Sequence, residues 1–427
     1  MGRKRAWWLA GLLSFVLVAA ACDGGDETTT SATTTETTAP TTVETTVAPT
    51  VETTVPAEAF KFGMILVGPD DDRGWSQAHF EAGQYVVEQL GNAEMIHLDL
   101  VNTADRPDQP VEQVAADMIG QGAQLIFATS DDMKDGIELA AEQNPDVPMI
   151  WSSGDSAWAE GKAYRADLTN LGNVMGQMEY GKMIAGCAAA LTSQTGSIGY
   201  LGPLINDETR RLVNSVYLGA RYCWENFRNQ DPDSLQVEVS WIGFWFHIPG
   251  VTADPTIVAN TFFDGGADVV ISGIDTTQAL VVAGQRAAAD ESVWAIPYDF
   301  QGACSEAPSA CLGVPYFNWG PAYLDIARSV IDGSFTAGFQ WLGPDWSDIN
   351  SPDTSMIGWL NGDGLAAETA ASLDQFIAGL ADGSIDPFVG PLNYQDGTPW
   401  LAEGEQATDF QIWYTEQLLE GMIGPSA

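Results

Sequence analysis

The segment GQGAQLIFATSDD, residues 120–132, decides how this chain folds, because DGGADVVISGIDT, residues 264–276, follows the same plan. Each copy places two glycines before a short apolar run, and each run ends at an acidic tip. The copies are offset by 144 residues, which makes Asp131 the counterpart of Asp275. Apolar runs of this length that follow helix-like segments predict buried parallel strands.

A second pair of segments repeats at the same offset. PMIWSSGD, residues 148–155, corresponds to SVWAIPYD, residues 292–299, so that Asp155 is the counterpart of Asp299. Ligands of open α/β sheets lie beyond the carboxyl ends of parallel strands. The repeat therefore predicts two facing lobes with a small-molecule site in the cleft between them.

Strand-like and helix-like segments alternate on both sides of these repeats, which is typical of βαβ units and parallel sheets. The expected strands are 62–67, 95–100, 124–128, 148–152, 196–201, 235–242, 268–271 and 293–297, with a crossing strand at 312–316. The expected helices are 76–90, 111–121, 133–143, 173–192, 208–228, 277–289 and 321–333, another after Asp254-Pro255, and two pieces near 365–381 and 408–422. The fold class expected is α/β, with two Rossmann-like lobes.

The body of the chain is too long for one ordinary hydrophobic core. We expect lobe 1 to combine residues 58–166 with 313–345, and lobe 2 to span 167–312. Residues 346–427 are expected to form a C-terminal extension that packs on the lobes.

The first 57 residues read as an export and anchoring region. Residues 1–21 combine a basic start with a short apolar run, as in a signal peptide, and the three alanines before Cys22 resemble a bacterial lipobox. That resemblance implies cleavage before Cys22 and lipidation of its sulfur; an ordinary secretory signal is the alternative. Residues 22–57 are rich in threonine and predict a disordered tether. The expected location is the extracytoplasmic face of the cell membrane.

The net charge of the chain excludes one class of partner. The formal net charge of −42 argues against nucleic acid as a partner.

An exported chain meets an oxidising compartment, so disulfides are allowed. The four cysteines after Cys22 permit three pairings, of which we favour Cys304–Cys311 and Cys187–Cys223; four free thiols are the alternative.

Several segments resemble the basic membrane protein family, the lipid-anchored substrate-binding proteins of ABC transporters that include purine-nucleoside receptors. They are DDDRGWSQAHFEAG, IGYLGPLINDETRRLVNSVYLGAR, WIGFWFHIPG, GADVVISGIDTTQAL, WAIPYDFQGACSEAPSACLGVPYFNWGPAY and the tail FVGPLNYQDGTPWLAEGE. The resemblance covers about residues 60–427 and implies a periplasmic-binding-protein type 1 fold that closes on its ligand like a hinge. It implies a purine nucleoside, a nucleobase or a similar heteroaromatic ligand, with ABC permease subunits as partners and a monomeric receptor.

The resemblance and the residue chemistry together give a set of candidate ligand-binding residues. Aromatic rings stack on a flat ligand, and carboxylates accept hydrogen bonds from a ribose or a ring N–H. By resemblance, Asp299 is the ribose-binding carboxylate and Trp245 lies near the base. The full set is Trp75, Ser76, His79, Phe80, Asp131, Asp155, Trp245, Asp275, Asp299 and Trp319.

The chain departs from the family at two places. Ser76-Gln77 stands where the family loop has Asn-Asp, and the Asn318-Trp319 region replaces a family lysine. Both changes touch base or sugar contacts, so a free nucleobase or another aromatic ring becomes a plausible ligand.

The sequence offers no candidate for catalysis. It contains no HExxH spacing, GxSxG elbow or P-loop, so we expect neither an enzyme, nor a metal site, nor a cofactor. Two other functions stay open: a sugar-binding receptor of the same fold, and a membrane-tethered ligand sensor for a signalling partner.

Overall fold

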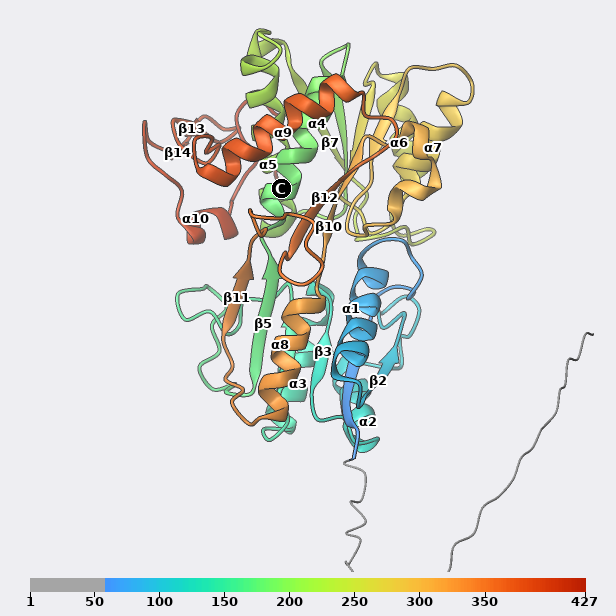
Figure 1. Ribbon diagram of the computed structural model, residues 1–427, viewed down its shortest axis with the longest axis vertical. Coiled ribbons are helices and arrows are strands. Elements are labelled where there is room, and N and C mark those ends of the chain that lie inside the picture. Colours follow the sequence, from blue (N-terminus) through green and yellow to red (C-terminus); the bar gives the residue numbers. More distant parts are fainter. Residues whose placement is uncertain (1–57) are drawn as a thin grey trace, which may run out of the picture. The chain divides into compact units, whose positions relative to one another are not determined.

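The structure is a computed structural model that describes residues 58–427. The predicted signal peptide, Cys22 and the threonine-rich tether lie outside the described residues. The described chain forms two α/β lobes with a pair of crossing strands between them (Figure 1).

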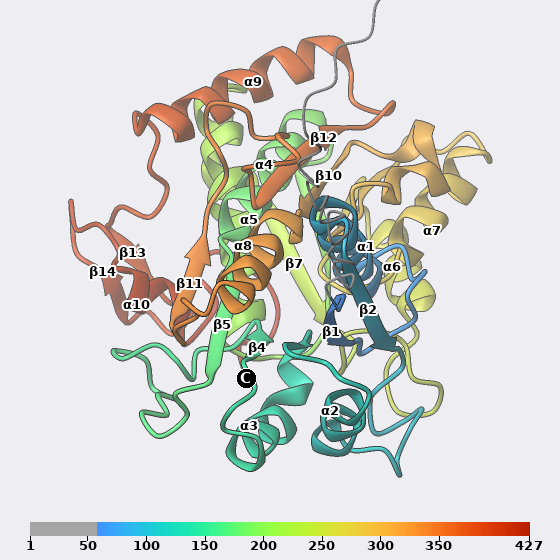
Figure 2. The same cartoon turned by 60° about the horizontal axis from the view of Figure 1, so that its bottom comes forward.

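Lobe 1 is built on six parallel strands in the order β11-β5-β4-β3-β1-β2. The strands are β1 (Phe60–Ile65), β2 (Ala93–Leu98), β3 (Ile126–Ala128), β4 (Met149–Ser152), β5 (Leu171–Gly176) and β11 (Phe339–Leu342). Figure 2 shows α1 (Trp75–Leu90) and α8 (Gly320–Ile331) on one face of the sheet, and α2 (Val111–Gly120) and α3 (Lys134–Gln143) on the other. The central strands read as continuous apolar runs because helices cover both faces.

Lobe 2 repeats this plan with four parallel strands in the order β7-β6-β8-β9. The strands are β6 (Ser197–Gly202), β7 (Gln236–Trp241), β8 (Val269–Ser272) and β9 (Trp294–Ile296). The helices are α4 (Met178–Thr192), α5 (Asp207–Asn226), α6 (Pro255–Asp264) and α7 (Gln278–Ala287). A disulfide joins Cys187 of α4 to Cys223 of α5, and a second joins Cys304 to Cys311. These are the two pairings that the sequence favoured.

Two strands run between the lobes. β10 (Gly313–Phe317) pairs antiparallel with β12 (Ile357–Asn361), and both lie between the lobes in Figure 1. The chain also passes from lobe 1 to lobe 2 where β5 leads into α4. These crossings give a two-lobed protein a common hinge region.

Residues after β12 form the C-terminal extension. Helix α9 (Ala367–Asp382) packs on α4, and the short elements β13 (Leu392–Asn393), β14 (Pro399–Leu401) and α10 (Asp409–Trp413) follow. The extension contacts both lobes: Ile423 bridges to Glu238 of β7, while the Trp158 ring of lobe 1 stacks on Tyr414.

The sequence misplaced one lobe boundary and did not predict strands β5, β11, β12, β13 and β14. Residues 171–176 were expected in lobe 2, with the helix starting at 173, but they form β5 of the lobe 1 sheet, between β4 and β11. Leu171, Val174, Met175 and Met178 fall at helical spacing, so periodicity alone favoured a helix. Strands β11 and β12 were not predicted, and the expected helix 408–422 ends at Trp413.

Candidate functional site

A narrow slot lies where the two lobes meet. Its cavity volume is about 10 Å³, and it is lined by Trp75, Ser130, Asp131, Ser153, Glu208, Trp245, Asp275 and Tyr298. Trp75 begins α1 in lobe 1, whereas Trp245 lies in the loop after β7 in lobe 2. Aromatic rings of both lobes therefore flank a small buried space.

The repeat found in the sequence meets at this slot. Asp131 follows β3 and Asp275 follows β8, and these counterparts line the same space from opposite lobes. Of the second pair of counterparts, Asp155 lines a neighbouring chamber, whereas Asp299 is fully buried and directly follows the slot residue Tyr298 without lining either space. Parallel strands place their carboxyl ends at one edge of each sheet, and here the two edges face each other.

The first loop closes the slot by direct contact between the lobes. The Asp72 carboxylate accepts hydrogen bonds from the backbone N–H groups of Gly74, at 2.8 Å, and Ser76, at 3.0 Å, and so fixes the start of α1. A Cβ atom on Gly74 would lie 1.6 Å from the carbonyl oxygen of Asp275. Only glycine fits this approach. The Ser76 hydroxyl accepts from the Gly68 N–H at 2.9 Å, so Ser76 braces the loop and does not line the slot.

Asp299 is the most unusual residue of the site. Its backbone φ is +71°, and neither oxygen of its fully buried carboxyl group has a hydrogen-bond partner. Burial raises its pKa well above the ordinary value, although nearby Lys182 opposes the shift. A buried polar group without a partner costs stability, so such a group in a cleft is a natural contact for a ligand.

Lys182 lies beneath the slot, in α4. Its Nζ donates to the carbonyl oxygen of Ser272 at 2.8 Å and lies 3.1 Å from the centroid of the Tyr298 ring. Burial lowers its pKa to about 7, while Asp299 and Glu208 act in the opposite direction. The ammonium therefore holds the slot residue Tyr298 from below.

The slot carboxyl groups share one electrostatic environment. Burial raises the pKa of Glu208 to about 7, with Arg211 opposing it. Burial also raises the pKa of Asp131, and it raises that of Asp275 well above the ordinary value. Near neutral pH the Glu208 carboxyl group can therefore donate as well as accept a hydrogen bond.

A larger chamber, with a cavity volume of about 300 Å³, lies next to the slot and shares Asp131, Ser153 and Glu208 with it. The chamber is also lined by Lys134, Trp151, Asp155, Lys162, Asn206, Asp207, Arg211, Trp413 and Tyr414. Trp413 and Tyr414 belong to the C-terminal extension, and the Tyr414 hydroxyl donates to the Asp155 carboxylate. This bond joins residues that are far apart in the sequence, so no local pattern predicts it.

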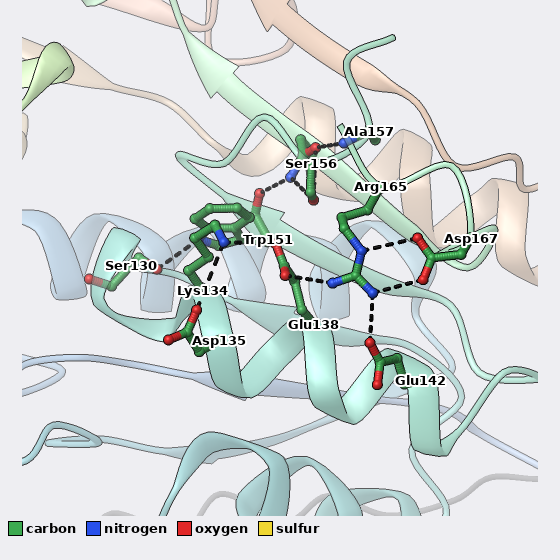
Figure 3. Close-up of polar contacts among 11 residues, drawn as sticks. Ser130, Lys134, Asp135, Glu138, Glu142, Trp151, Ser156, Ala157, Arg165 and Asp167 are labelled. Carbon is green, nitrogen blue, oxygen red and sulfur yellow. Dashed lines mark hydrogen bonds and ion pairs between the residues drawn. The ribbon is translucent and has the colours of Figure 1, made fainter. Parts of the chain in front are cut away.

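Figure 3 shows the polar contacts of Arg165, which follows Asp155 and Lys162 in the segment between β4 and β5. Arg165 contacts Glu138 at 2.9 Å, Glu142 at 2.6 Å and Asp167 at 2.7 Å, which ties the loop to α3. Deeper in the same wall, the Trp151 indole donates to the carbonyl oxygen of Ser130 at 2.9 Å. These contacts stabilise the lobe 1 wall of the chamber.

Three further predicted residues lie outside the slot. His79 is buried: its Nδ1 is 2.7 Å from the Tyr323 hydroxyl, and its ring stacks on Trp319 at 4.3 Å. Burial lowers the pKa of His79 well below its ordinary value. Trp319 is fully buried, and Phe80 packs on His97. His79 and Trp319 pack between α1 and the start of α8 and do not line the slot, and Trp319 lines a separate cavity.

Sequence reasoning missed several residues that build the site. Tyr298 directly precedes Asp299, and Ser153 lies two residues before Asp155, so the repeat itself gave a signal for both. Glu208, Lys182 and Arg211 lie on helices, where nothing in their local sequence marks them. Within residues 58–427, no three His, Cys, Asp or Glu side chains are grouped so as to hold a metal ion.

Two α/β lobes that close on a buried slot define the class of two-lobed solute receptors. Residues 59–343 match the family described as Bmp, ABC transporter substrate-binding protein PnrA-like. The chain belongs to this family of substrate-binding proteins of ABC transporters, which are extracytoplasmic receptors and not enzymes. None of the helices in the described residues has the length and apolar content that a membrane span needs.

Relatives with known names agree with this class. A purine-binding protein of Brucella abortus is 30% identical over 354 residues, covering 82% of this chain and 89% of the relative. A Haloferax volcanii protein, provisionally named as an ABC transporter glucose-binding protein, is 29% identical over 293 residues, covering 67% of this chain and 65% of that protein.

Solved structures share the fold at low sequence identity. A solute-binding protein of an ABC transporter system from Aeropyrum pernix has a TM-score of 0.60 at 14% identity, covering 78% of this chain and 94% of its own. One from Conexibacter woesei has a TM-score of 0.55 at 19% identity, covering 77% and 98%. These likenesses confirm the α/β fold with two parallel sheets.

Proposed function

We propose that this protein is the lipid-anchored receptor of an ABC importer and that it binds a purine nucleoside, a nucleobase or a similar heteroaromatic molecule. The observation that carries the proposal is the buried carboxyl group of Asp299, which directly follows the slot residue Tyr298 and whose two oxygens have no hydrogen-bond partner. The purine-binding relative, which covers most of the chain, supports the same ligand class.

The slot residues suit a flat ring with polar edges. The indoles of Trp75 and Trp245 offer faces for stacking, worth about 1–3 kcal/mol per base. Asp131 and Asp275 offer groups that pair with ring nitrogens and oxygens from opposite lobes. Asp299 accepts from a ligand N–H or O–H, which satisfies the carboxyl group that the protein leaves unpaired.

In our proposal, the permease recognises the closed, ligand-bound form of the receptor. The lobes open about β10, β12 and the β5–α4 connection, and a ligand that contacts both lobes favours the closed form. Arg73 of the first loop forms an ion pair with Glu306 of lobe 2, which adds to closure at the surface. Cys22, when lipidated, holds the monomeric receptor at the membrane beside the permease.

The proposal is tested by titrating purified protein, refolded to remove bound solute, with adenine, adenosine, guanosine, inosine and riboflavin in a calorimeter. Binding of at least one purine compound, with loss of affinity in Trp245→Ala, is expected. Heat from none of the five would refute the ligand class. Labelling with radioactive palmitate in the native host tests the anchor, and Cys22→Ser is expected to abolish the label.

A sugar receptor is the second candidate, favoured by the Haloferax volcanii relative. Tryptophan rings also stack on sugar rings, so the slot by itself fits either ligand. The ultraviolet spectrum of solute released on denaturation separates the two, because purines absorb near 260 nm and simple sugars do not.

A further inference from the structure

The C-terminal extension passes from one lobe to the other just after α10. Tyr414 packs in the hydrophobic cluster around the lobe 1 sheet, whereas Leu418 and Met422 pack in the cluster between α4, α5 and the lobe 2 sheet. Figure 1 shows α10, which directly precedes Tyr414, where the two lobes meet. All of these residues lie beyond the residues 59–343 that match the family.

The extension is attached to lobe 2 through its backbone. Arg210 Nε donates to the carbonyl oxygen of Thr415 at 2.8 Å. Asn214 Nδ2 donates to the carbonyl oxygen of Gln417 at 2.9 Å. Ile423 forms two backbone hydrogen bonds with β7, at 2.9 and 2.8 Å. Because these bonds are spread along α5 and β7, this part of the extension moves with lobe 2.

The side chain of Tyr414 makes the polar contact with lobe 1. Its hydroxyl donates to the Asp155 carboxylate and accepts from the backbone N–H of Lys162 at 2.6 Å. Both bonds depend on one side-chain oxygen, so they can break without disturbing the backbone of the extension.

The ring of Tyr414 also fits against lobe 1. It is parallel to the Trp158 ring, with 4° between the planes and 5.7 Å between the centroids. Lys162 Nζ lies 4.5 Å from the Tyr414 centroid. A Cβ atom on Gly161 would lie 2.8 Å from the Tyr414 hydroxyl, so a larger residue there would push the hydroxyl away. The lobe 1 segment 155–162 is therefore shaped around this side chain.

This contact lies beside the gap between the lobes. Asp155 and Tyr414 line the chamber together with Asp207 and Arg211 of α5. Lobe 1 and α5 are thus two walls of one space. Rotation about the hinge moves Asp155 away from α5, to which the extension is bound, and so separates Tyr414 from its two lobe 1 partners.

We propose that the C-terminal extension is a clasp, which is carried by lobe 2 and holds lobe 1 through Tyr414 when the lobes are closed. Contacts that exist only in the closed form shift the equilibrium towards that form by their own free energy. The clasp therefore slows opening and the release of the enclosed solute. Tyr414 acts here as a positioning residue for closure. Because the clasp does not depend on the kind of solute, it goes beyond the proposed function.

Tyr414→Phe tests the clasp, because it removes the hydroxyl and keeps the ring. Stopped-flow kinetics with adenosine should show a dissociation rate raised about tenfold, through loss of a hydrogen bond to a charged group, and an unchanged association rate. Tyr394→Phe is the matched control and should change neither rate. Tyr394 lies in the same extension, and its hydroxyl accepts from the Glu416 N–H within the extension.

A second measurement needs no ligand. Small-angle X-ray scattering of the refolded, solute-free protein should give a larger radius of gyration for Tyr414→Phe than for the wild type, because the open form becomes more populated. The Tyr394→Phe protein should match the wild type.

The outcomes separate the clasp from the ligand class. Another of the five compounds replaces adenosine if adenosine does not bind. A dissociation rate that Tyr414→Phe leaves unchanged, or that Tyr394→Phe raises equally, would overturn the clasp and leave the proposed function standing. If none of the five compounds binds, the proposed ligand class fails and the radius of gyration alone decides. A larger value for Tyr414→Phe then supports the clasp, and an unchanged value refutes it.

Discussion

Replacing Asp299 by Asn should weaken ligand binding without destabilising the free protein. Asn is nearly isosteric with Asp, and it tolerates the left-handed backbone that Asp299 adopts at φ +71°. In the free protein the carboxyl group has no hydrogen-bond partner, and its raised pKa means that the fold disfavours its charge. The substitution removes no hydrogen bond of the free protein, although the attraction between this carboxyl group and the buried Lys182 is lost.

The effect on binding follows from the contact that the ligand makes. A hydrogen bond to a charged group contributes about 1.5–3 kcal/mol. Asn keeps one acceptor oxygen but replaces the other with a donor, which opposes a ligand N–H or O–H. We expect Kd to rise roughly 10- to 150-fold, because each 1.4 kcal/mol is a factor of ten.

Asp268→Asn is the matched control in the same lobe. Asp268 is 6% exposed and precedes β8, at the opposite end of the sheet from Asp299. Its carboxylate accepts from the Ser193 hydroxyl and the Gln194 N–H, both at 2.6 Å, and from the Thr195 N–H at 3.1 Å. Loss of these bonds should lower the free energy of unfolding by about 1–3 kcal/mol. Affinity for the ligand should not change.

Urea denaturation gives the free energy of unfolding of each variant, and calorimetry gives the affinity of each variant for the ligand. We expect Asp299→Asn to lose affinity and keep stability, whereas Asp268→Asn should lose stability and keep affinity. An Asp299→Asn protein that binds like the wild type, or that unfolds as readily as the control, would refute a ligand-facing role for this carboxyl group.

Trp245→Ala should raise Kd about 5- to 150-fold by removing one stacking face, with little change in the unfolding midpoint because the ring is only half-buried. The pKa of Glu208 is about 7 in the folded protein, against an ordinary value of 4.5. Between these pH values Glu208 is protonated in the folded protein and ionised in the unfolded chain. The free energy of unfolding should then fall as pH rises from 5 to 7; Glu208→Gln should reduce that fall by on the order of 2 kcal/mol. Breaking the Cys187–Cys223 bridge with Cys187→Ser should cost roughly 3–4 kcal/mol in urea denaturation, because the bridge spans 36 residues.

The sequence by itself determined the two-lobed plan. Alternating apolar runs and helices predicted parallel sheets, and the offset of 144 residues predicted that Asp131 and Asp275 would be equivalent. Both conclusions rest on local properties, namely strand length, helix periodicity and the acidic residue that ends each strand. The structure places this pair on opposite sides of one slot.

Periodicity failed where two structures satisfy the same pattern. The apolar residues of 171–178 fit a helix as well as a buried strand, and only pairing with β4 and β11 selects the strand. His79 and Trp319 were also predicted to bind the ligand, and neither lines the slot. Their residue types suit a binding site, but α1 and the crossing strands orient them into the core.

Only the tertiary structure decided which polar groups lack partners. The Asp155–Tyr414 bond joins residues 259 apart, and Arg211 of α5 reaches Glu179 of α4. Whether a side chain is already paired depends on such long-range contacts, which a local sequence pattern does not encode. The unpaired oxygens of Asp299 and the unpaired donor of Arg211 could therefore be found only after the lobes and the C-terminal extension were assembled.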